Sequence, residues 1–369
     1  MEKTLAYLIL TVSSILLFSC SNEEIIPAIN KDFVEMPVSI GITLSSQTQL
    51  ETKATPDELT GTCNADKVLL LVYSGATTIT DRRLLTYHSQ QTLECVKEGR
   101  QWVARGSITG NANTNYSIFA IAYNSGDLGN FEILPDPLQE SITTYGDTKV
   151  SLKYTATPSS TLNSYNTPEF FVGNVIPQGT TNDIFLADGE VKLTGTLYRA
   201  VGKIQFNLTN IPANIKKVSL LSEKIAEYNI LYRISEHGTI FSKYPMGIPP
   251  AGELRKYISE IATAERTENT IWQATLESFI IPLTESLLYV DATDENDKTT
   301  RYLIKCANQK YNSIWIYVIG YGVESYRFSI PPNYQIRISG EFQELQNSGN
   351  VLIDLSNMEE FDGGFLPVG

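Results

Sequence analysis

Histidine, tryptophan and cysteine are scarce in this chain of 369 residues, which contains two, three and four of them respectively. The two histidines, His88 and His237, are far apart in the sequence, and no Cys-x-x-Cys spacing occurs. Because these residues are the usual ligands of structural zinc, their scarcity argues against a metal site. The sequence also lacks Gly-x-Ser-x-Gly, His-Glu-x-x-His and a glycine-rich phosphate loop. We therefore expect no catalytic residues, no metal and no other cofactor, and hence a protein that is not an enzyme.

Clusters of lysine and arginine are also missing, and the formal net charge is -13 at pH 7. A nucleic-acid backbone would need such clusters, so nucleic acid is not an expected partner. The densest acidic group, residues 291–297, lies where a hairpin turn is expected and does not follow the ligand order of an EF-hand. We interpret this group as a polar turn rather than a calcium site.

The N-terminus has the pattern of a bacterial lipoprotein signal. A mostly apolar run without charge, residues 5–18, is followed by Ser19 and Cys20, which fits cleavage just before the cysteine. The polar residues that follow lack the Lys and Arg of a stop-transfer flank, which argues against a permanent transmembrane anchor. We predict a signal peptide over 1–19, acylation of Cys20 with palmitate among its chains, and a tether over 20–35. Several acyl chains together give stable attachment, and the absence of Asp after the cysteine favours the outer membrane.

The rest of the sequence is typical of an all-β protein. Residues 38–45 alternate apolar and small polar side chains with a period of two, which indicates a half-buried strand. Further strands are expected at 67–73, 101–109, 116–123, 149–154, 190–197, 201–208, 217–221, 275–282, 287–292, 301–306, 313–321 and 333–340. Short helices are expected only at 136–146 and 251–265. The regular spacing of short strands predicts two tandem β-sandwich domains, over 36–190 and 191–369.

A short internal echo supports the two-domain interpretation. Residues 115–118 read Asn-Tyr-Ser-Ile and residues 333–336 read Asn-Tyr-Gln-Ile, each beside a predicted strand and one in each half of the chain. The order of predicted strands around the two segments is also parallel. We interpret the chain as two similar domains that meet near residues 187–198.

The cysteines other than Cys20 belong to an oxidising compartment if the chain is exported. Cys63 and Cys95 lie in the same predicted domain and could form a disulfide, which would leave Cys306 as a buried thiol.

The C-terminal tail is unusually apolar for a chain end. The side chains expected to be buried are Val351, Ile353, Leu355, Phe361 and Phe365. Two interpretations stay open at this point: the tail is the last strand of its own domain, or it docks on a partner by strand addition.

Several motifs follow one another along the chain. The first is the lipoprotein box with the acidic segment 21–24 after it, followed by Thr52-Lys53-Ala54 in the loop after the early strand. The others are Glu169-Phe170-Phe171-Val172-Gly173, the segment 197–204 (Leu-Tyr-Arg-Ala-Val-Gly-Lys-Ile) and the segment 333–340 (Asn-Tyr-Gln-Ile-Arg-Ile-Ser-Gly). In this order the motifs resemble the fimbrillin superfamily, the subunits of type V pili of Bacteroidales, and the resemblance covers essentially the whole chain.

This resemblance implies two transthyretin-like Greek-key β-sandwich domains and a role as a structural subunit of a fimbria that supports adhesion. The precursor would reach the outer membrane and cell surface as a lipoprotein, and a protease would then cut the loop after the first strand. The cut would fall between Lys53 and Ala54, and a strand of another fimbrial subunit, in a homopolymer or as an anchor or tip partner, would replace the lost strand. The side chains of the removable strand would be Val38, Ile40, Ile42 and Leu44. The donor would be the tail with Val351, Ile353, Leu355, Phe361 and Phe365.

One departure from the family pattern leaves an alternative open. The best-known processing in the family is specific for arginine, whereas the loop here offers only Lys53, and Arg82 and Arg83 come much later. Either a protease of another specificity acts, or the subunit is never cut. An uncut subunit would keep its lipid and serve as a fimbrial anchor or tip protein, or stay a monomeric surface protein.

A surface glycan-binding lipoprotein is the rival from another functional class. The 20 tyrosines could stack on sugar rings. The three tryptophans, Trp102, Trp272 and Trp315, fall within or beside apolar strand patterns, so core packing is the simpler explanation for them.

Overall fold

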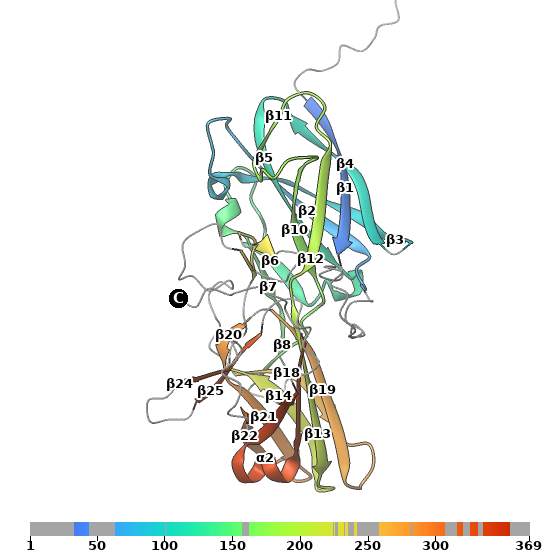
Figure 1. The fold of residues 1–369 in the computed structure, drawn as a ribbon, viewed down its shortest axis with the longest axis vertical. Coiled ribbons are helices and arrows are strands. Elements are labelled where there is room, and N and C mark those ends of the chain that lie inside the picture. The colour runs from blue at the N-terminus through green and yellow to red at the C-terminus, as the bar shows by residue number, and fades with distance from the viewer. Residues whose placement is uncertain are drawn as a thin grey trace, which may run out of the picture.

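Residues with alternating apolar side chains form strands along most of the chain. The structure, a computed structural model, describes residues 33–43, 63–99, 101–156, 162–223, 225, 228–231, 233–234, 240–241, 258–281, 283–306, 316–319, 325–330 and 335–354. Figure 1 shows two lobes stacked along the long axis, with most of the earlier strands in one lobe and the later ones in the other.

The strands of the first half are β1 (Phe33–Thr43), β2 (Lys67–Gly75), β3 (Thr86–Glu98), β4 (Gln101–Asn111), β5 (Thr114–Tyr123), β6 (Phe131–Leu134), β7 (Lys149–Leu152), β8 (Tyr154–Ala156), β9 (Asn163–Tyr165), β10 (Phe171–Pro177), β11 (Phe185–Ala187) and β12 (Leu193–Arg199). Three single-turn 3-10 helices join them, η2 (Arg82–Leu84), η3 (Ser125–Asp127) and η4 (Tyr145–Asp147).

The second half continues with β13 (Gly202–Ile211), β14 (Ile215–Ser222), β15 (Tyr228–Asn229), β16 (Arg233–Ile234), β17 (Ile240–Phe241), β18 (Ser259–Glu265), β19 (Trp272–Ile280), β20 (Leu283–Ser286), β21 (Leu288–Asp294), β22 (Thr299–Leu303), β23 (Lys305–Cys306), β24 (Ile316–Ile319), β25 (Ser325–Ile330), β26 (Gln335–Glu341), the helix α2 (Phe342–Ser348) and β27 (Asn350–Asp354).

Eight strands of the first half form one sheet in the order β10-β12-β1-β4-β3-β2-β5-β11. Because β10 also pairs with β5, seven of these strands close into a ring, which we call the barrel. Closure gives each of the seven strands a partner on both sides and so protects their edges. The interior is filled by one side of every strand, with Met36, Ile40 and Tyr116 among its fully buried side chains.

The second lobe is built from two larger sheets. Their orders are β19-β13-β26-β27-β23 and β22-β21-β14-β18-β9-β8. A second apolar core runs from the outer face of the barrel, at Tyr73 and Phe119, down to Phe206 and Phe342 in this lobe. The two lobes therefore share one continuous core in addition to the barrel's own interior.

Strands are exchanged between the two lobes. From the first half, β9 pairs with β18 of the second lobe, with Ser164 opposite Glu260. From the second half, β15 pairs with β7 of the first lobe, with Tyr228 opposite Val150. Each lobe is thus completed by a piece of the other half of the chain.

The predicted all-β class is confirmed, whereas the predicted helices are wrong where they can be compared. Residues 259–265 form the strand β18, and the segment 136–146 contains only the start of the short η4 turn. The helix α2 was not expected; it ends at Gly349, whose φ of 73° suits glycine. No helix in the described part of the chain is long and apolar enough to cross a bilayer.

Strand positions agree better than helix positions, with two instructive differences. β1 begins at Phe33, inside the predicted tether 20–35, and β12 pairs with β10 and β1 although the predicted boundary at 190/191 placed it in the second domain. The long strand β3 was not predicted, because its exposed half carries mainly polar residues. That the lobes are transthyretin-like Greek-key sandwiches, and where one domain ends, stay predictions.

Candidate functional site: the first strand and the joint between the lobes

β1 is one of the seven strands that form the barrel, and its side chains alternate strictly between the inner and the outer face. Its inward side chains are Val34, Met36, Val38, Ile40 and Ile42, all at most 9% exposed. Burial of a large aliphatic side chain stabilises by about 1.5–3 kcal/mol, so these five together hold β1 in place by roughly 10 kcal/mol. These non-covalent contacts would therefore hold β1 in the barrel even if the chain were cut after it.

Only part of β1 is paired on both sides. All but its last residue run antiparallel to β4 in register, whereas the parallel pairing with β12 begins at Val38, opposite Leu193. Pro37, which has no N–H to donate, stands just before this doubly paired part, where a missing donor removes no bond to β12. The doubly paired part, 38–42, largely coincides with the strand that the sequence predicted as removable.

The segment that joins β1 to β2 lies outside the described residues. This applies to Leu44, Lys53 and Ala54, and also to Cys20 in the N-terminal segment. Their predicted roles as strand residue, cut site and lipid site are therefore untested.

The later arginines differ sharply in access. The Arg82 side chain is 2% exposed and forms an ion pair, whereas the Arg83 side chain is 47% exposed beside Asp81. A protease could not reach the Arg82 side chain without unfolding this part of the barrel.

Two of the motifs that carry the family resemblance lie side by side. In the register of β10 with β12, Phe171 stands opposite Arg199, and the buried Glu169 accepts a hydrogen bond from Arg199 Nε at 2.8 Å. Gly173 is required by close packing, since a Cβ there would stand 2.3 Å from the carbonyl oxygen of Thr196. The motifs thus fix the wall of the barrel next to β1.

The two cysteines of the barrel, Cys63 and Cys95, are both buried and are present as free thiols. Burial raises the pKa of Cys63 to about 12 and that of Cys95 to about 11, so both thiols stay protonated at neutral pH. The structure therefore does not contain the disulfide that the sequence left possible between them. The side chain of Cys306 lies outside the described residues.

The start of the tail forms β27, which lies between β26 and β23 in the sheet of the second lobe. In its backbone register Ile353 stands opposite Ile338, and Val351 stands opposite Cys306. Leu355, Phe361 and Phe365 lie outside the described residues. The sequence left open whether the tail pairs within its own domain or docks on a partner. β27 pairs within its own lobe, and the donor role of the tail stays a prediction.

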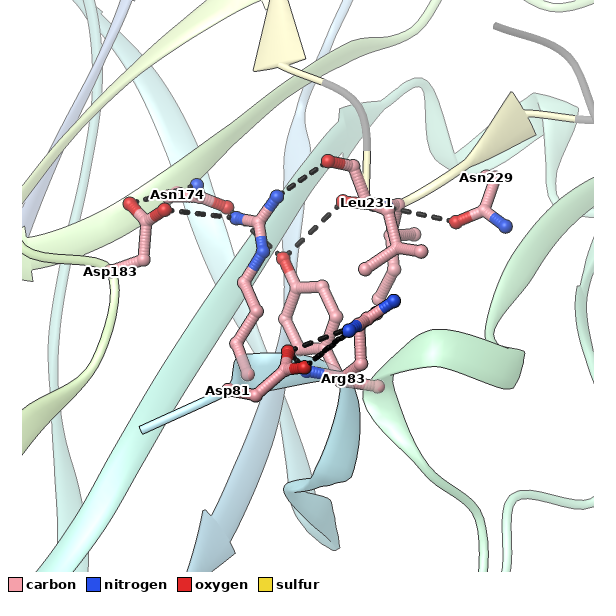
Figure 2. Close-up of polar contacts among 9 residues, drawn as sticks. Asp81, Arg83, Asn174, Asp183, Asn229 and Leu231 are labelled. Atoms are coloured by element: carbon pink, nitrogen blue, oxygen red, sulfur yellow. Dashed lines mark hydrogen bonds and ion pairs between the residues drawn. The ribbon is translucent and has the colours of Figure 1, made fainter. Parts of the chain in front are cut away.

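Sequence reasoning missed the joint between the lobes, which surrounds a buried guanidinium. Arg82 Nη1 donates to Asp183 Oδ2 at 3.1 Å, and Arg82 Nη2 donates to the carbonyl oxygen of Leu231 at 2.5 Å. Figure 2 shows Asp183, Asn174 and Leu231, from three separate segments, gathered around this group. The Arg82 guanidinium also lies 5.1 Å from the centre of the Tyr145 ring.

Other polar contacts attach the same crossing segment, residues 228–231. The Tyr145 hydroxyl lies 3.3 Å from the carbonyl oxygen of Ile230, and the Leu231 N–H donates to Asn229 Oδ1. No sequence signal marks this joint, because its members are scattered over 150 residues and none belongs to a motif. The joint is built to hold two lobes together rather than to bind a ligand.

The acidic segment 291–297 covers the end of β21 and the polar turn after it, at 295–297, where the sequence predicted a turn. Asp294 accepts hydrogen bonds from the backbone of Asn296 and Lys298, and Asp297 pairs with Lys216. The described residues contain no group of three or more His, Cys, Asp or Glu side chains that could hold a metal ion. Phe33 is the one aromatic residue among their exposed large apolar side chains.

No family model matches this chain, and no curated protein does. Several solved structures are similar to it. The chain is similar to a protein of Bacteroides thetaiotaomicron described as polysaccharide-binding, at 13% identity and a TM-score of 0.45 over 83% of this chain and 92% of that one. It is also similar to the fimbrial anchor protein Mfa2 of Porphyromonas gingivalis, at 12% identity and a TM-score of 0.41 over 87% and 95%.

The tip fimbrial protein Mfa3 of the same organism matches at 10% identity and a TM-score of 0.31, over 83% of this chain and 94% of that chain. The similar structures thus comprise fimbrial proteins and a protein described as polysaccharide-binding, all from Bacteroidales, the group whose fimbrillins the sequence motifs resemble.

Proposed function

We propose that this protein is a lipid-anchored fimbrial subunit of the outer membrane and cell surface, which acts by strand complementation and supports adhesion without catalysis. Acylated Cys20 attaches the precursor. A cut between Lys53 and Ala54 then separates β1 from the rest of the barrel, and a strand from another subunit takes its place. The position of β1 carries this proposal.

Removal of β1 would leave two unpaired strand edges, those of β4 and β12, beside an apolar trough. Both defects are costly, because backbone donors and acceptors lose their partners while the inner face of the barrel meets water. One incoming strand with alternating apolar side chains would correct both at once. Since roughly 10 kcal/mol holds β1, a cut alone would not release it quickly, and the incoming strand must displace it.

Limited proteolysis of the mature chain without its lipid tests this function. Trypsin is expected to cut first after Lys53, as read by N-terminal sequencing of the fragments, and the cut protein is expected to form filaments visible by electron microscopy. The control variant Lys53→Gln should resist this cut and stay monomeric. A wild-type protein that is cut after Lys53 and never assembles would contradict the stalk role.

The alternative of an uncut anchor or tip protein is favoured by one observation. The loop after β1, residues 44–66, contains no arginine, and Lys53 is its only basic residue. Resistance of Lys53 to proteolysis, with the lipid retained on Cys20, would support this role. A glycan-binding surface lipoprotein has less support, because exposed aromatic side chains do not gather on the described surface.

A further inference from the structure

A pocket of about 330 Å³ opens on the outside of the barrel, between β3 and β6. Leu69 of β2 and Tyr87 and Gln90 of β3 line one side, and residues of the segment 128–138 line most of the other. Leu69 and Tyr87 pack against the core outside the barrel, so the pocket is separate from the barrel interior. Its volume lies at the small end of the range for small-molecule sites, about 300–1,000 Å³. This size suits a ligand of one or two small rings.

Both sides of the pocket are held in place by the fold. β6 pairs with β7, with Phe131 opposite Leu152. On the other side, the Tyr87 ring packs edge-on against the Tyr73 ring, with 6.0 Å between the ring centres. A backbone hydrogen bond of 2.8 Å from the Ser141 N–H to the carbonyl oxygen of Tyr87 ties the loop after β6 to β3. The pocket is therefore formed before any ligand binds.

The polar side chains that line the pocket have no partners within the described part of the chain. They are Tyr87, Gln90, Glu132, Asp136 and Lys153, and none of the five side chains makes a hydrogen bond or an ion pair there. The carboxylates only accept hydrogen bonds, the ammonium group only donates them, and the amide and the phenol do both. A ligand that satisfies this set must offer donors and acceptors together.

The remaining lining is apolar. Leu69, Phe131, Pro137 and Leu138 contribute to it, and Phe131 is only 4% exposed because its ring also packs against Tyr123 at 5.2 Å between centres. Small-molecule sites usually combine such an apolar lining with a few polar groups that orient the ligand. The ligand should therefore have one apolar face in addition to its polar groups.

A larger cavity, of about 470 Å³ between β18 and β19, lacks this feature. Its carboxylates already have partners in the protein. Glu260 accepts a hydrogen bond from Ser219 Oγ at 2.6 Å and pairs with Lys217 at 3.3 Å, and Glu277 pairs with Lys203 at 2.8 Å. Because these groups satisfy one another, a ligand would have to break existing contacts to bind there.

We propose that the pocket between β3 and β6 binds one uncharged hexopyranose residue of a surface glycan. Each sugar hydroxyl both donates and accepts, so it suits carboxylates and an ammonium group at once, while the C–H face of the ring covers the apolar lining. An acidic sugar is disfavoured, because Glu132 and Asp136 outnumber Lys153. This inference deepens the adhesion role in the proposed function but does not require a cut chain. It also needs no aromatic cluster on the open surface, since Tyr87 belongs to the pocket wall.

Methyl NMR on the full mature chain tests this site. The Lys53→Gln variant, which stays uncut, is titrated at millimolar concentrations with the methyl glycosides of glucose, galactose, mannose and N-acetylglucosamine. At least one of them should shift the methyl signals of Leu128 and Leu138, which line the pocket, and leave Ile261 at the larger cavity unchanged. Glucuronic acid should bind at least about fivefold more weakly.

Three results of the titration would overturn the proposal. One is that no glycoside shifts the Leu128 and Leu138 signals. Another is that the glycosides shift Ile261 instead. The third is that arginine methyl ester shifts the pocket signals and no glycoside does, because the pocket would then take a cationic side chain of a protein partner.

Variants of the same shape test which groups bind the sugar. Glu132→Gln and Asp136→Asn should each weaken binding by about fivefold or more, because hydrogen bonds to charged groups are roughly twice as strong as neutral ones. Tyr87→Phe removes only the hydroxyl and should weaken binding by about three- to fivefold. The matched control Glu277→Gln removes a carboxylate at the larger cavity and should leave the affinity within about twofold. Equal losses in Glu132→Gln and Glu277→Gln would contradict the site.

The results also separate this site from strand complementation. Filaments that form after the cut, from a chain that binds no sugar, would remove the site and leave strand complementation standing. Sugar binding by the uncut chain, together with a cut chain that never assembles, would keep the site and contradict the stalk role.

Discussion

β1 and β13 occupy the same place in their respective lobes but are connected to the chain in different ways. β1 lies between antiparallel β4 and parallel β12, and β13 lies between antiparallel β19 and parallel β26. After β13 a tight turn at 212–214 leads directly into β14, whereas residues 44–66 separate β1 from β2. A cut in the connection between β1 and β2 would therefore break no tight turn, whereas a cut between β13 and β14 would break the turn at 212–214.

The two lobes also differ in whether their strands close into a ring. β3 and β4 pair directly and help to close the barrel, with Cys95 opposite Ala104. At the corresponding place in the second lobe, no ladder joins β18 and β19 among the described residues. A cavity of about 470 Å³ lies there, lined in part by Glu260, Thr263 and Glu277. A closed barrel needs all seven of its strands, so the loss of β1 opens the whole barrel. The second lobe is already open between β18 and β19.

The largest effect is expected at the joint, where the two lobes would be uncoupled. Arg82→Ala leaves Asp183 as a buried charge without its ion-pair partner, and this should lower the free energy of unfolding by about 3–5 kcal/mol. Urea denaturation followed by tryptophan fluorescence and circular dichroism measures the change. The control Arg83→Ala removes an exposed pair and should change stability by about 0–1 kcal/mol. Equal losses in the two variants would mean that the joint does not couple the lobes.

The second prediction compares the two equivalent strands directly. Phe206→Ala in β13 should cost about 3–5 kcal/mol and Ile40→Ala in β1 about 2–5 kcal/mol in the intact chain, since both side chains are fully buried. Once β1 has been exchanged for a free peptide, the loss from Ile40→Ala should vanish while that from Phe206→Ala persists. Thermal unfolding before and after exchange shows whether the strands differ in this way. A persistent Ile40 effect would show that β1 stays in the barrel.

The smallest effect concerns the cysteines of the barrel. Because burial raises the pKa of Cys63 to about 12 from an ordinary 9.0, the folded chain keeps a proton that the unfolded chain loses as the pH rises. In reducing buffer, the free energy of unfolding should therefore fall as the pH rises above about 9, with full stability below it. The variant carrying Cys63→Ala and Cys95→Ala should show a shallower fall. An identical pH dependence in both proteins would contradict the buried-thiol account.

Much of the strand content follows from local pattern, whereas the relation between the lobes does not. The echo that the sequence offered joins residues 115–118, in β5, with residues 333–336, which lead into β26. These strands have unlike partners, since β5 pairs with β2 and β10 while β26 pairs with β13 and β27. The true equivalence, between β1 and β13, is visible only in the pairing, because a short alternating strand has no sequence that distinguishes it from others.

The candidate site divides in the same way. Val38, Ile40 and Ile42 could be predicted because a period of two places them on one face of a strand. The packing around Met36 could not, because Gly110 comes from β4, and only the register places it against Met36. The joint was hidden for a related reason, since Arg82 and Leu231 are 149 residues apart.

By itself the sequence determined that this chain is built from strands and that residues 38–42 form a strand with one buried face. Both follow from the alternation of side chains, which is a local property. Only the tertiary structure decided that this strand is one of the seven strands of a closed barrel, that the lobes exchange strands, and that the buried Arg82 binds the carbonyl oxygen of Leu231. Strand order and register depend on which distant segments pair with each other, and no local sequence pattern in this chain predicts those pairings.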